Sequence, residues 1–330
     1  MNDTNNKLLF HFTESLKVLN RSEGTIKAYT MQIRLFLKQQ NPADLKAITS
    51  TDMESWVASL FDHKQEDGRG YTTGTICLKV RSLKRFFEFL ERSNIIFINP
   101  MEEIREPRQD KTIPRDILTK TEITKLLDQP NLSTRTGIRD RTILELFYST
   151  GIRLQELCKL SIFDIDLQGK MVRINQGKGR KDRVVPMGKH AVRFLREYIT
   201  KIRPAFGKKN RKCRVLFLNQ LGNPLSKQVV SLMIRNCVKN AGLTKKKISA
   251  HTFRHTFASV LVKNGADVVA VQKMLGHRDL RTTQGYIKRL GVDLKKAHSK
   301  SHPREKDTIS RKSIKPKIKR MRPEYASRKP

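Results

Sequence analysis

The stretch AHTFRHTFA occupies residues 250–258 and carries polar groups at helical spacing. His251 and Arg254 are three residues apart, so one helical turn presents both side chains to the same point. A neutral imidazole accepts a proton near neutral pH, and a guanidinium binds two phosphate oxygens at once. His255 directly follows Arg254 in the sequence and faces away from the point that His251 and Arg254 share, so we expect a supporting structural role for it.

A second polar pair lies upstream, in TGIRLQEL at residues 150–157. Arg153 follows a glycine-containing turn, where a side chain can project from the start of a helix. Glu156 lies three residues further on, on the same helical face, and can brace the Arg153 guanidinium. Arg153 and Arg254 are therefore the candidates for stabilising the negative charge that develops on a phosphate during its transfer.

A third motif follows, in which Tyr286 lies nine residues after the histidine of Leu275-Gly276-His277. Of the six tyrosines in the chain, only Tyr286 has this relation to a Leu-Gly-His turn. A phenol has a pKa of about 10 and becomes an effective nucleophile only beside a base and a cationic pocket. Tyr286 is the candidate nucleophile, and we expect His277 to donate a hydrogen bond to the phosphate.

Residues 171–187 predict a β-hairpin, because alternating apolar positions flank the turn sequence Gly-Lys-Gly-Arg at 177–180. The tip of this hairpin is basic. We expect three of its side chains, Arg180, Lys181 and Arg183, to contact DNA phosphates.

These motifs, in this order and spacing, resemble the boxes of the tyrosine recombinase, or phage integrase, family, and are most similar to its Xer-like branch. The resemblance runs from about residue 8 to Arg304, which is nearly the whole chain except the C-terminal tail. Each box alone is short and weakly specific. The boxes together, in the family's order, are specific.

The resemblance implies a reaction in which Tyr286 attacks a DNA phosphate, leaving a 3′-phosphotyrosine and a free 5′ hydroxyl. His251 accepts the tyrosine proton, and Lys178, in Gly177-Lys-Gly179, protonates the departing 5′ oxygen. The catalytic residues so implied are Tyr286, Arg153, Lys178, His251, Arg254 and His277. The resemblance also implies that four protomers, as a homotetramer or as a heterotetramer with a related recombinase, exchange strands between paired double-stranded DNA sites through a Holliday junction. We expect no metal or other cofactor to take part.

Apolar residues recur every three or four positions through much of the first hundred residues, which predicts helices, including 25–39 and 75–92. Capping boxes at 51–54 and 119–122 predict two further helix starts. The helix at 75–92 has a basic face that we expect to be exposed and to contact the DNA backbone, formed by Lys79, Arg81, Lys84 and Arg85.

The chain contains 68 Lys and Arg against 31 Asp and Glu, for a formal net charge of +37. A chain this basic repels itself unless a polyanion neutralises it, which makes nucleic acid the leading partner. No apolar run approaches the roughly 20 residues needed to span a bilayer, and no secretory signal opens the sequence, so we expect a cytoplasmic, nucleoid-associated protein. The four widely spaced cysteines predict neither a zinc cluster nor disulfides.

We predict a mainly helical α+β fold with a small sheet, in two domains. The expected segments are a helical, SAM-like core-binding domain at 1–106, a charged linker at 107–115, a catalytic recombinase domain at 116–298 and a basic, disordered tail at 299–330.

Three other functions fit part of the pattern. A type IB topoisomerase-like activity uses the same pocket, but the N-terminal half resembles the recombinase core-binding domain. A DNA-binding protein without catalysis would not need Tyr286 or the pair His251 and Arg254. A metal nuclease needs clustered carboxylates, and the nearest approach, Asp164 and Asp166, is expected in the turn before the hairpin. The sequence leaves open whether recombination resolves chromosome or plasmid dimers or moves a mobile element.

Overall fold

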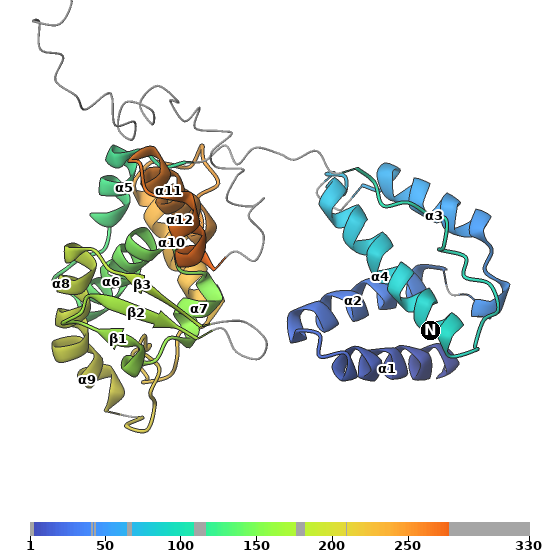
Figure 1. Cartoon of the computed structure of the whole chain (residues 1–330), viewed down its shortest axis with the longest axis horizontal. Helices are drawn as coiled ribbons and strands as arrows, with labels where there is room; N and C mark the ends of the chain where they lie inside the picture. The colour runs from blue at the N-terminus through green and yellow to red at the C-terminus, as the bar shows by residue number, and fades with distance from the viewer. Residues whose placement is uncertain are drawn as a thin grey trace, which may run out of the picture. The chain divides into compact units, whose positions relative to one another are not determined.

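The computed structural model describes residues 3–40, 42, 44–64, 68–108, 117–175, 182–208 and 210–276. The chain divides into two compact units, Met1–Thr112 and Ile113–Pro330 (Figure 1). In the described ranges, no helix is both long enough and apolar enough to cross a membrane. All four cysteines are free thiols.

The first unit is helical. Its α-helices are α1 (Asp3–Val18), α2 (Glu23–Gln40), α3 (Ser50–Asp62) and α4 (Thr73–Arg92), with one 3-10 turn at Leu45–Ala47. Helix α4 supplies more buried core residues than any other helix of this unit, because its apolar face is fully buried. Phe86 of α4 packs edge-on against Phe12 of α1, and Phe87 packs against Phe36 of α2, so aromatic contacts join three helices.

Two predictions for this unit are wrong in detail. The capping box that opens α3 is formed by Thr49 and Asp52, not by residues 51 and 54. Lys79 of α4 is not exposed: only 4% of its surface is accessible, and its ammonium lies 4.6 Å from the centre of the Tyr71 ring. Burial lowers the pKa of Lys79, and the side chain does not form part of an exposed basic face.

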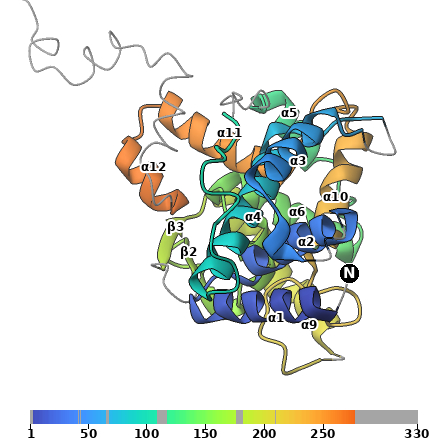
Figure 2. The same cartoon turned by 90° about the vertical axis from the view of Figure 1, so that its right-hand side faces the viewer.

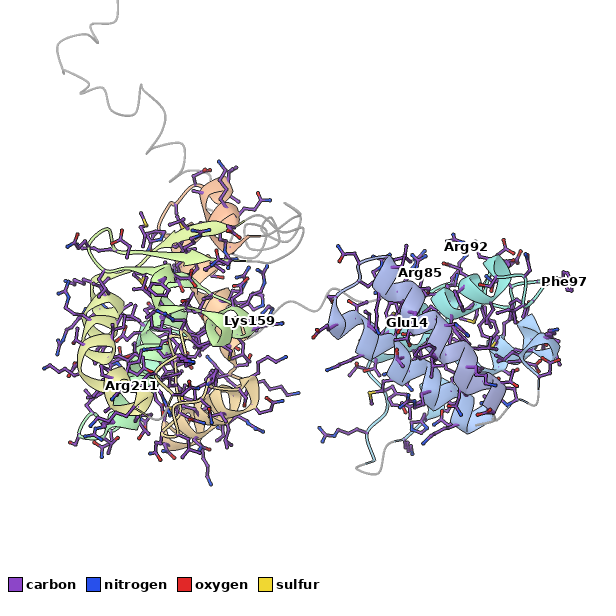
Figure 3. The ribbon with its side chains drawn as sticks, turned by 90° about the horizontal axis from the view of Figure 1, so that it is seen from below. Glu14, Arg85, Arg92, Phe97, Lys159 and Arg211 are labelled. Carbon is purple, nitrogen blue, oxygen red and sulfur yellow. The ribbon has the colours of Figure 1, made fainter. Side chains whose placement is uncertain are left out.

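The other three residues of the predicted basic face of α4 reach the surface, but each has a partner. Arg81 forms an ion pair with Glu106, and Arg85 forms one with Glu88. Lys84 donates a hydrogen bond to the backbone carbonyl of Glu102. Arg85 also appears on the surface of this unit in Figure 3. Because exposed ion pairs contribute little free energy, these cations remain available to an anionic partner.

The second unit is built around α6, which packs against α8 and α11. Its α-helices are α5 (Lys120–Leu127), α6 (Arg135–Thr150), α7 (Leu154–Lys159), α8 (Lys189–Glu197), α9 (Arg203–Gly207), α10 (Lys227–Asn240), α11 (Ala250–Lys263) and α12 (Val268–Leu275). A π-helical segment, Tyr198–Ile202, joins α8 to α9, and a 3-10 turn spans Ile162–Asp164. The predicted capping box of Thr119 and Glu122 is present at the start of α5.

A three-stranded antiparallel sheet completes this unit, in the order β1 (Ile165–Asp166), β2 (Met171–Ile174) and β3 (Arg183–Pro186). The predicted hairpin of β2 and β3 is confirmed, with Ile174 opposite Arg183. Strand β1 was not predicted: Asp166 lies in it rather than in a turn. Helix α12 lies beside β3 (Figures 1 and 2).

The turn between α6 and α7 depends on Gly151, which ends α6 in the left-handed conformation with φ of 60°. A Cβ atom on Gly151 would lie 2.6 Å from Cδ1 of Phe257 and 3.1 Å from Cδ2 of Leu275. This position therefore requires glycine both for its backbone conformation and for space. The turn brings Arg153 to the start of α7.

We predict that Gly151→Ala destabilises the protein more than Gly242→Ala. Gly242 also has a positive φ, 69°, but a Cβ atom there would meet nothing within 4 Å. Gly242→Ala should cost about 1–2 kcal/mol for the left-handed conformation alone. Gly151→Ala should add about 1–3 kcal/mol for overpacking against Phe257. Denaturant unfolding followed by circular dichroism measures both, and equal losses would contradict the steric argument.

Candidate active site

Helix α11 presents the first part of the site. Ser249 caps the helix, accepting a hydrogen bond from the His251 backbone N–H at 3.2 Å. His251 is exposed, whereas Arg254, one turn later, is only 2% accessible. The ring of His255 packs edge-on against the ring of His251, with centroids 4.3 Å apart. His255 thus lies where it can limit the orientation of the His251 imidazole.

The N-terminal end of α7 presents the second part. Arg153 is the N-cap residue, and its backbone N–H donates to Oε2 of Glu156 at 2.8 Å. The Arg153 guanidinium donates from Nη1 to Oε1 of the same carboxylate, also at 2.8 Å. The contact between Arg153 and Glu156 that the sequence predicts is therefore present, and it holds both the backbone and the side chain of Arg153.

These two parts face one cavity of about 430 Å³. Arg153, His251 and Arg254 line it together. Helix α10 adds Ser231 and the exposed Arg235, which the sequence did not indicate. Nothing in the sequence of α10 distinguishes Arg235 from other surface cations until the helix is placed beside α11.

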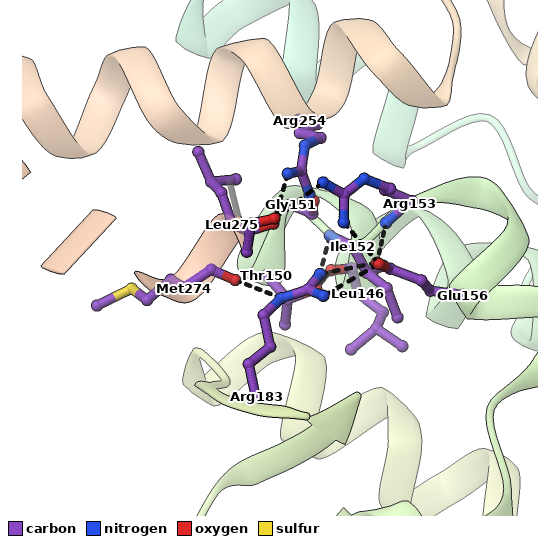
Figure 4. A network of polar contacts seen from close by, with 11 residues as sticks. Leu146, Thr150, Gly151, Ile152, Arg153, Glu156, Arg183, Arg254, Met274 and Leu275 are labelled. Atoms are coloured by element: carbon purple, nitrogen blue, oxygen red, sulfur yellow. Dashed lines mark hydrogen bonds and ion pairs between the residues drawn. The ribbon is translucent and has the colours of Figure 1, made fainter. Parts of the chain in front are cut away.

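Arg183 joins this site from the sheet. The sequence predicts a phosphate contact for Arg183, but the structure buries it to 8% accessibility and pairs it with Glu156. Its Nη1 and Nη2 atoms donate to Oε1 and Oε2 of Glu156 at 3.0 and 2.7 Å, in a two-pronged ion pair (Figure 4). Arg183 is also not among the residues that line the cavity, whereas the more deeply buried Arg254 is. The expected exposed position of Arg183 at the hairpin is therefore corrected: its guanidinium lies against Glu156.

The last carbonyls of α12 and its cap accept hydrogen bonds from three arginines (Figure 4). Arg183 Nε donates to the Met274 carbonyl at 2.7 Å, Arg254 Nη2 to that of Leu275 at 2.5 Å and Arg153 Nη2 to that of Gly276 at 3.2 Å. A helix leaves its final carbonyls without partners inside the helix, and its C-terminal end carries partial negative charge. Guanidinium groups donate hydrogen bonds to these carbonyls, and their positive charge is favourable at this end of the helix.

The electrostatics of the cavity favour one protonation state for each titratable group. Burial alone would raise the pKa of Glu156, but hydrogen bonds from Arg183 and from the Arg153 backbone outweigh it and lower the pKa to about 2. His251 is exposed as a residue, but its imidazole lines the cavity and is partly desolvated there. This desolvation, reinforced by the positive charges of Arg254 and Arg153, lowers the pKa of His251 from its ordinary value of 6.5. At neutral pH the carboxylate is therefore charged and the imidazole is neutral.

Five predicted site residues lie outside the described residues: Lys178, Arg180, Lys181, His277 and Tyr286. Within the described parts of the chain, no three His, Cys, Asp or Glu side chains come together in a group that could hold a metal ion.

Comparison with known proteins decides the family. Residues 116–290 match the phage integrase family, and residues 9–94 match the phage integrase N-terminal SAM-like domain. The chain belongs to the phage integrase family. The predicted fold class is confirmed for this tyrosine recombinase: a helical SAM-like domain is followed by a catalytic domain with a small sheet.

Relatives of this recombinase cover most of its length. Tyrosine recombinase XerD of Staphylococcus saprophyticus is 36% identical over 286 residues, covering 86% of this chain and 94% of that protein. Tyrosine recombinase XerC 2 of Ralstonia nicotianae is 34% identical, covering 89% of this chain and 84% of that protein. A crystal structure of the XerH site-specific recombinase bound to a palindromic difH substrate, after cleavage, has a TM-score of 0.69 at 25% identity and covers 85% of this chain and 80% of that one.

We predict that Glu156 makes stability depend on pH in the acid range. Its pKa is depressed on folding, so its contribution is present above the unfolded value of 4.5 and is lost as pH falls towards about 2. The full shift corresponds to about 3 kcal/mol. The stability difference between wild type and Glu156→Gln should therefore be largest near neutral pH and shrink below pH 4.5. Unfolding free energies across this range test it, with the exposed Glu54→Gln as control. A pH-independent difference would contradict the prediction.

We also predict that Arg153→Gln raises the pKa of His251. Removing a nearby positive charge lowers the cost of protonating the imidazole, although burial and Arg254 still depress its pKa. Imidazole NMR titration measures the shift, with the His251 signal assigned from its loss in His251→Asn. Arg214→Gln is the control, because Arg214 stacks on Phe163 and is not among the charges acting on His251. An unchanged or lower pKa in Arg153→Gln would show that Arg153 does not act on His251.

Proposed function

We propose that this chain is a site-specific DNA recombinase that cleaves and rejoins strands through a covalent bond between Tyr286 and a DNA 3′ phosphate. The observation that carries the proposal is the convergence of Arg153, His251 and Arg254 on one cavity. Two arginines and a neutral histidine together supply charge stabilisation and proton transfer at one phosphate.

Each group has a defined part in the proposed reaction. As the Tyr286 oxygen attacks phosphorus, negative charge grows on the non-bridging oxygens, where Arg153 and Arg254 bind it. His251 accepts the phenol proton, which a neutral imidazole can do and an imidazolium cannot. Lys178 protonates the departing 5′ oxygen, and His277 donates a hydrogen bond to the phosphate. The phosphotyrosine retains the energy of the broken bond, so rejoining needs neither ATP nor a metal.

The partners follow from charge and from relatives. A net charge of +37 suits double-stranded DNA. The chain has relatives named XerC and XerD, and the XerH structure contains a difH substrate. We propose paired recombination sites, bound by four protomers as a homotetramer or as a heterotetramer with a related recombinase, and exchange through a Holliday junction.

We propose that both domains clamp the DNA. Residues 1–106 form the core-binding domain, in which Arg81, Lys84 and Arg85 offer surface cations to the DNA backbone. Residues 107–115 link it to the catalytic domain at 116–298, where Arg180 and Lys181 follow Lys178 in sequence. The basic tail at 299–330 adds affinity without sequence preference. The protein acts at the nucleoid in the cytoplasm.

The proposal predicts a covalent adduct that depends on Tyr286. A nicked suicide substrate, carrying a candidate site from the host's replication-terminus region or from the gene's own flanks, is incubated with protein in the absence of metal. Wild type and Tyr148→Phe should form a denaturation-resistant protein–DNA adduct, and Tyr286→Phe should not. An adduct that persists in Tyr286→Phe would identify a different nucleophile. Tight, salt-sensitive binding of this DNA without any adduct in wild type would contradict the proposed cleavage.

A further inference from the structure

Arg183 makes more contacts with the site than its place in the hairpin suggests. Its guanidinium donates two hydrogen bonds to the carboxylate of Glu156 and one to the Met274 carbonyl. It is nearly inaccessible and, unlike Arg254, does not line the cavity, so its role must be exerted through these neighbours rather than on substrate.

Glu156 connects Arg183 to Arg153. Glu156 holds Arg153 by its backbone N–H and by its guanidinium, and Arg183 occupies both oxygens of the same carboxylate. If Arg183 were lost, the carboxylate would be balanced by Arg153 alone. Because a buried charge requires compensation, the Arg153 guanidinium would be drawn more fully onto Glu156 and away from the cavity.

The Met274 carbonyl connects Arg183 to the C-terminal end of α12. The Met274 carbonyl accepts from Arg183, and the next two carbonyls accept from Arg254 and Arg153. Gly276 is followed directly in sequence by His277. Arg183 therefore fixes the part of the backbone from which the chain continues towards His277 and Tyr286.

Arg183 is itself anchored in the sheet. It is the first residue of β3 and pairs with Ile174, the last residue of β2. In the sequence, Lys178 lies between these same two residues. A single side chain at the base of the hairpin thus contacts both Glu156 and the end of α12.

We propose that Arg183 is a positioning residue for strand cleavage, acting through Glu156 on Arg153 and through the Met274 carbonyl on the end of α12. The proposal rests on the proposed function, because it concerns the same site. Lysine cannot replace it fully, since an ammonium is a compact point charge without the planar fork that spans a carboxylate and a carbonyl.

The chain offers a matched control in Arg139. This arginine of α6 has the same accessibility, 8%, pairs with Asp140 and donates from Nη1 to the Leu218 carbonyl at 3.2 Å. It contacts neither Glu156 nor α12 through any of these bonds. A purely structural arginine should behave as Arg139 does.

The test compares Arg183→Lys with Arg139→Lys in the full chain. Three quantities are measured for each: the thermal midpoint, the affinity for the suicide substrate, and the single-turnover rate of adduct formation at a temperature where both variants are folded. Arg183→Lys should form adduct about 10- to 100-fold more slowly with unchanged DNA affinity, because a small displacement of catalytic groups has an effect of this size. Arg139→Lys should cleave at the wild-type rate. A wild-type rate for Arg183→Lys would overturn the proposal.

A double-mutant comparison tests the route through Glu156. Glu156→Gln and Arg183→Met should each slow adduct formation, and the double variant should be no slower than Arg183→Met, because both changes interrupt one path. Rates that multiply in the double variant would overturn the route. If wild type bound the DNA but formed no adduct, the proposed function itself would fail, and this proposal with it. Slow cleavage by every Arg183 variant beside a normal wild-type adduct supports both.

Discussion

The catalytic unit depends on a largely buried carboxylate, that of Glu156, held between two guanidinium groups. Placing a charge in a protein interior is costly unless it is paired and its hydrogen-bonding capacity is filled. Glu156 meets this condition with four hydrogen bonds, two from Arg153 and two from Arg183. Because Arg153 opens α7 and Arg183 opens β3, this carboxylate joins a helix and the sheet at the edge of the cavity.

Arginines also stabilise the C-terminal end of α12. Its last carbonyls need donors, and Arg153, Arg183 and Arg254 provide them. Arg254 also donates to the carbonyl of Gly151, at 2.8 Å, in the turn that precedes Arg153. The two arginines that we assign to the phosphate are therefore held by backbone groups, which pre-organises them for their task at little cost on binding.

Much of this arrangement could be predicted because it is local. The spacing of His251 and Arg254 required only a helix, and the pair Arg153 and Glu156 required only one helical turn. The features that the sequence did not reveal depend on contacts between distant elements. Arg183 resembles any cation near a basic turn until Glu156 and Met274, from other elements, are placed around it.

Three smaller errors have equally physical causes. Lys79 has the spacing of an exposed residue on α4, and only the position of Tyr71, in the loop before the helix, shows that it is covered. The start of α3 offers two overlapping Thr-x-x-acid patterns, and sequence alone does not choose between them. Strand β1 has two residues, too few for alternation to be visible.

The most direct test is a structure of the full-length Tyr286→Phe variant bound to its DNA site. We predict that guanidinium nitrogens of Arg153 and Arg254 both lie within hydrogen-bonding distance of one phosphate, with His251 beside it. Arg183 should keep its bonds to Glu156 and to the Met274 carbonyl. A complex in which Arg183 leaves Glu156 to bind DNA, or in which no phosphate enters the cavity, would contradict the proposed roles of these residues.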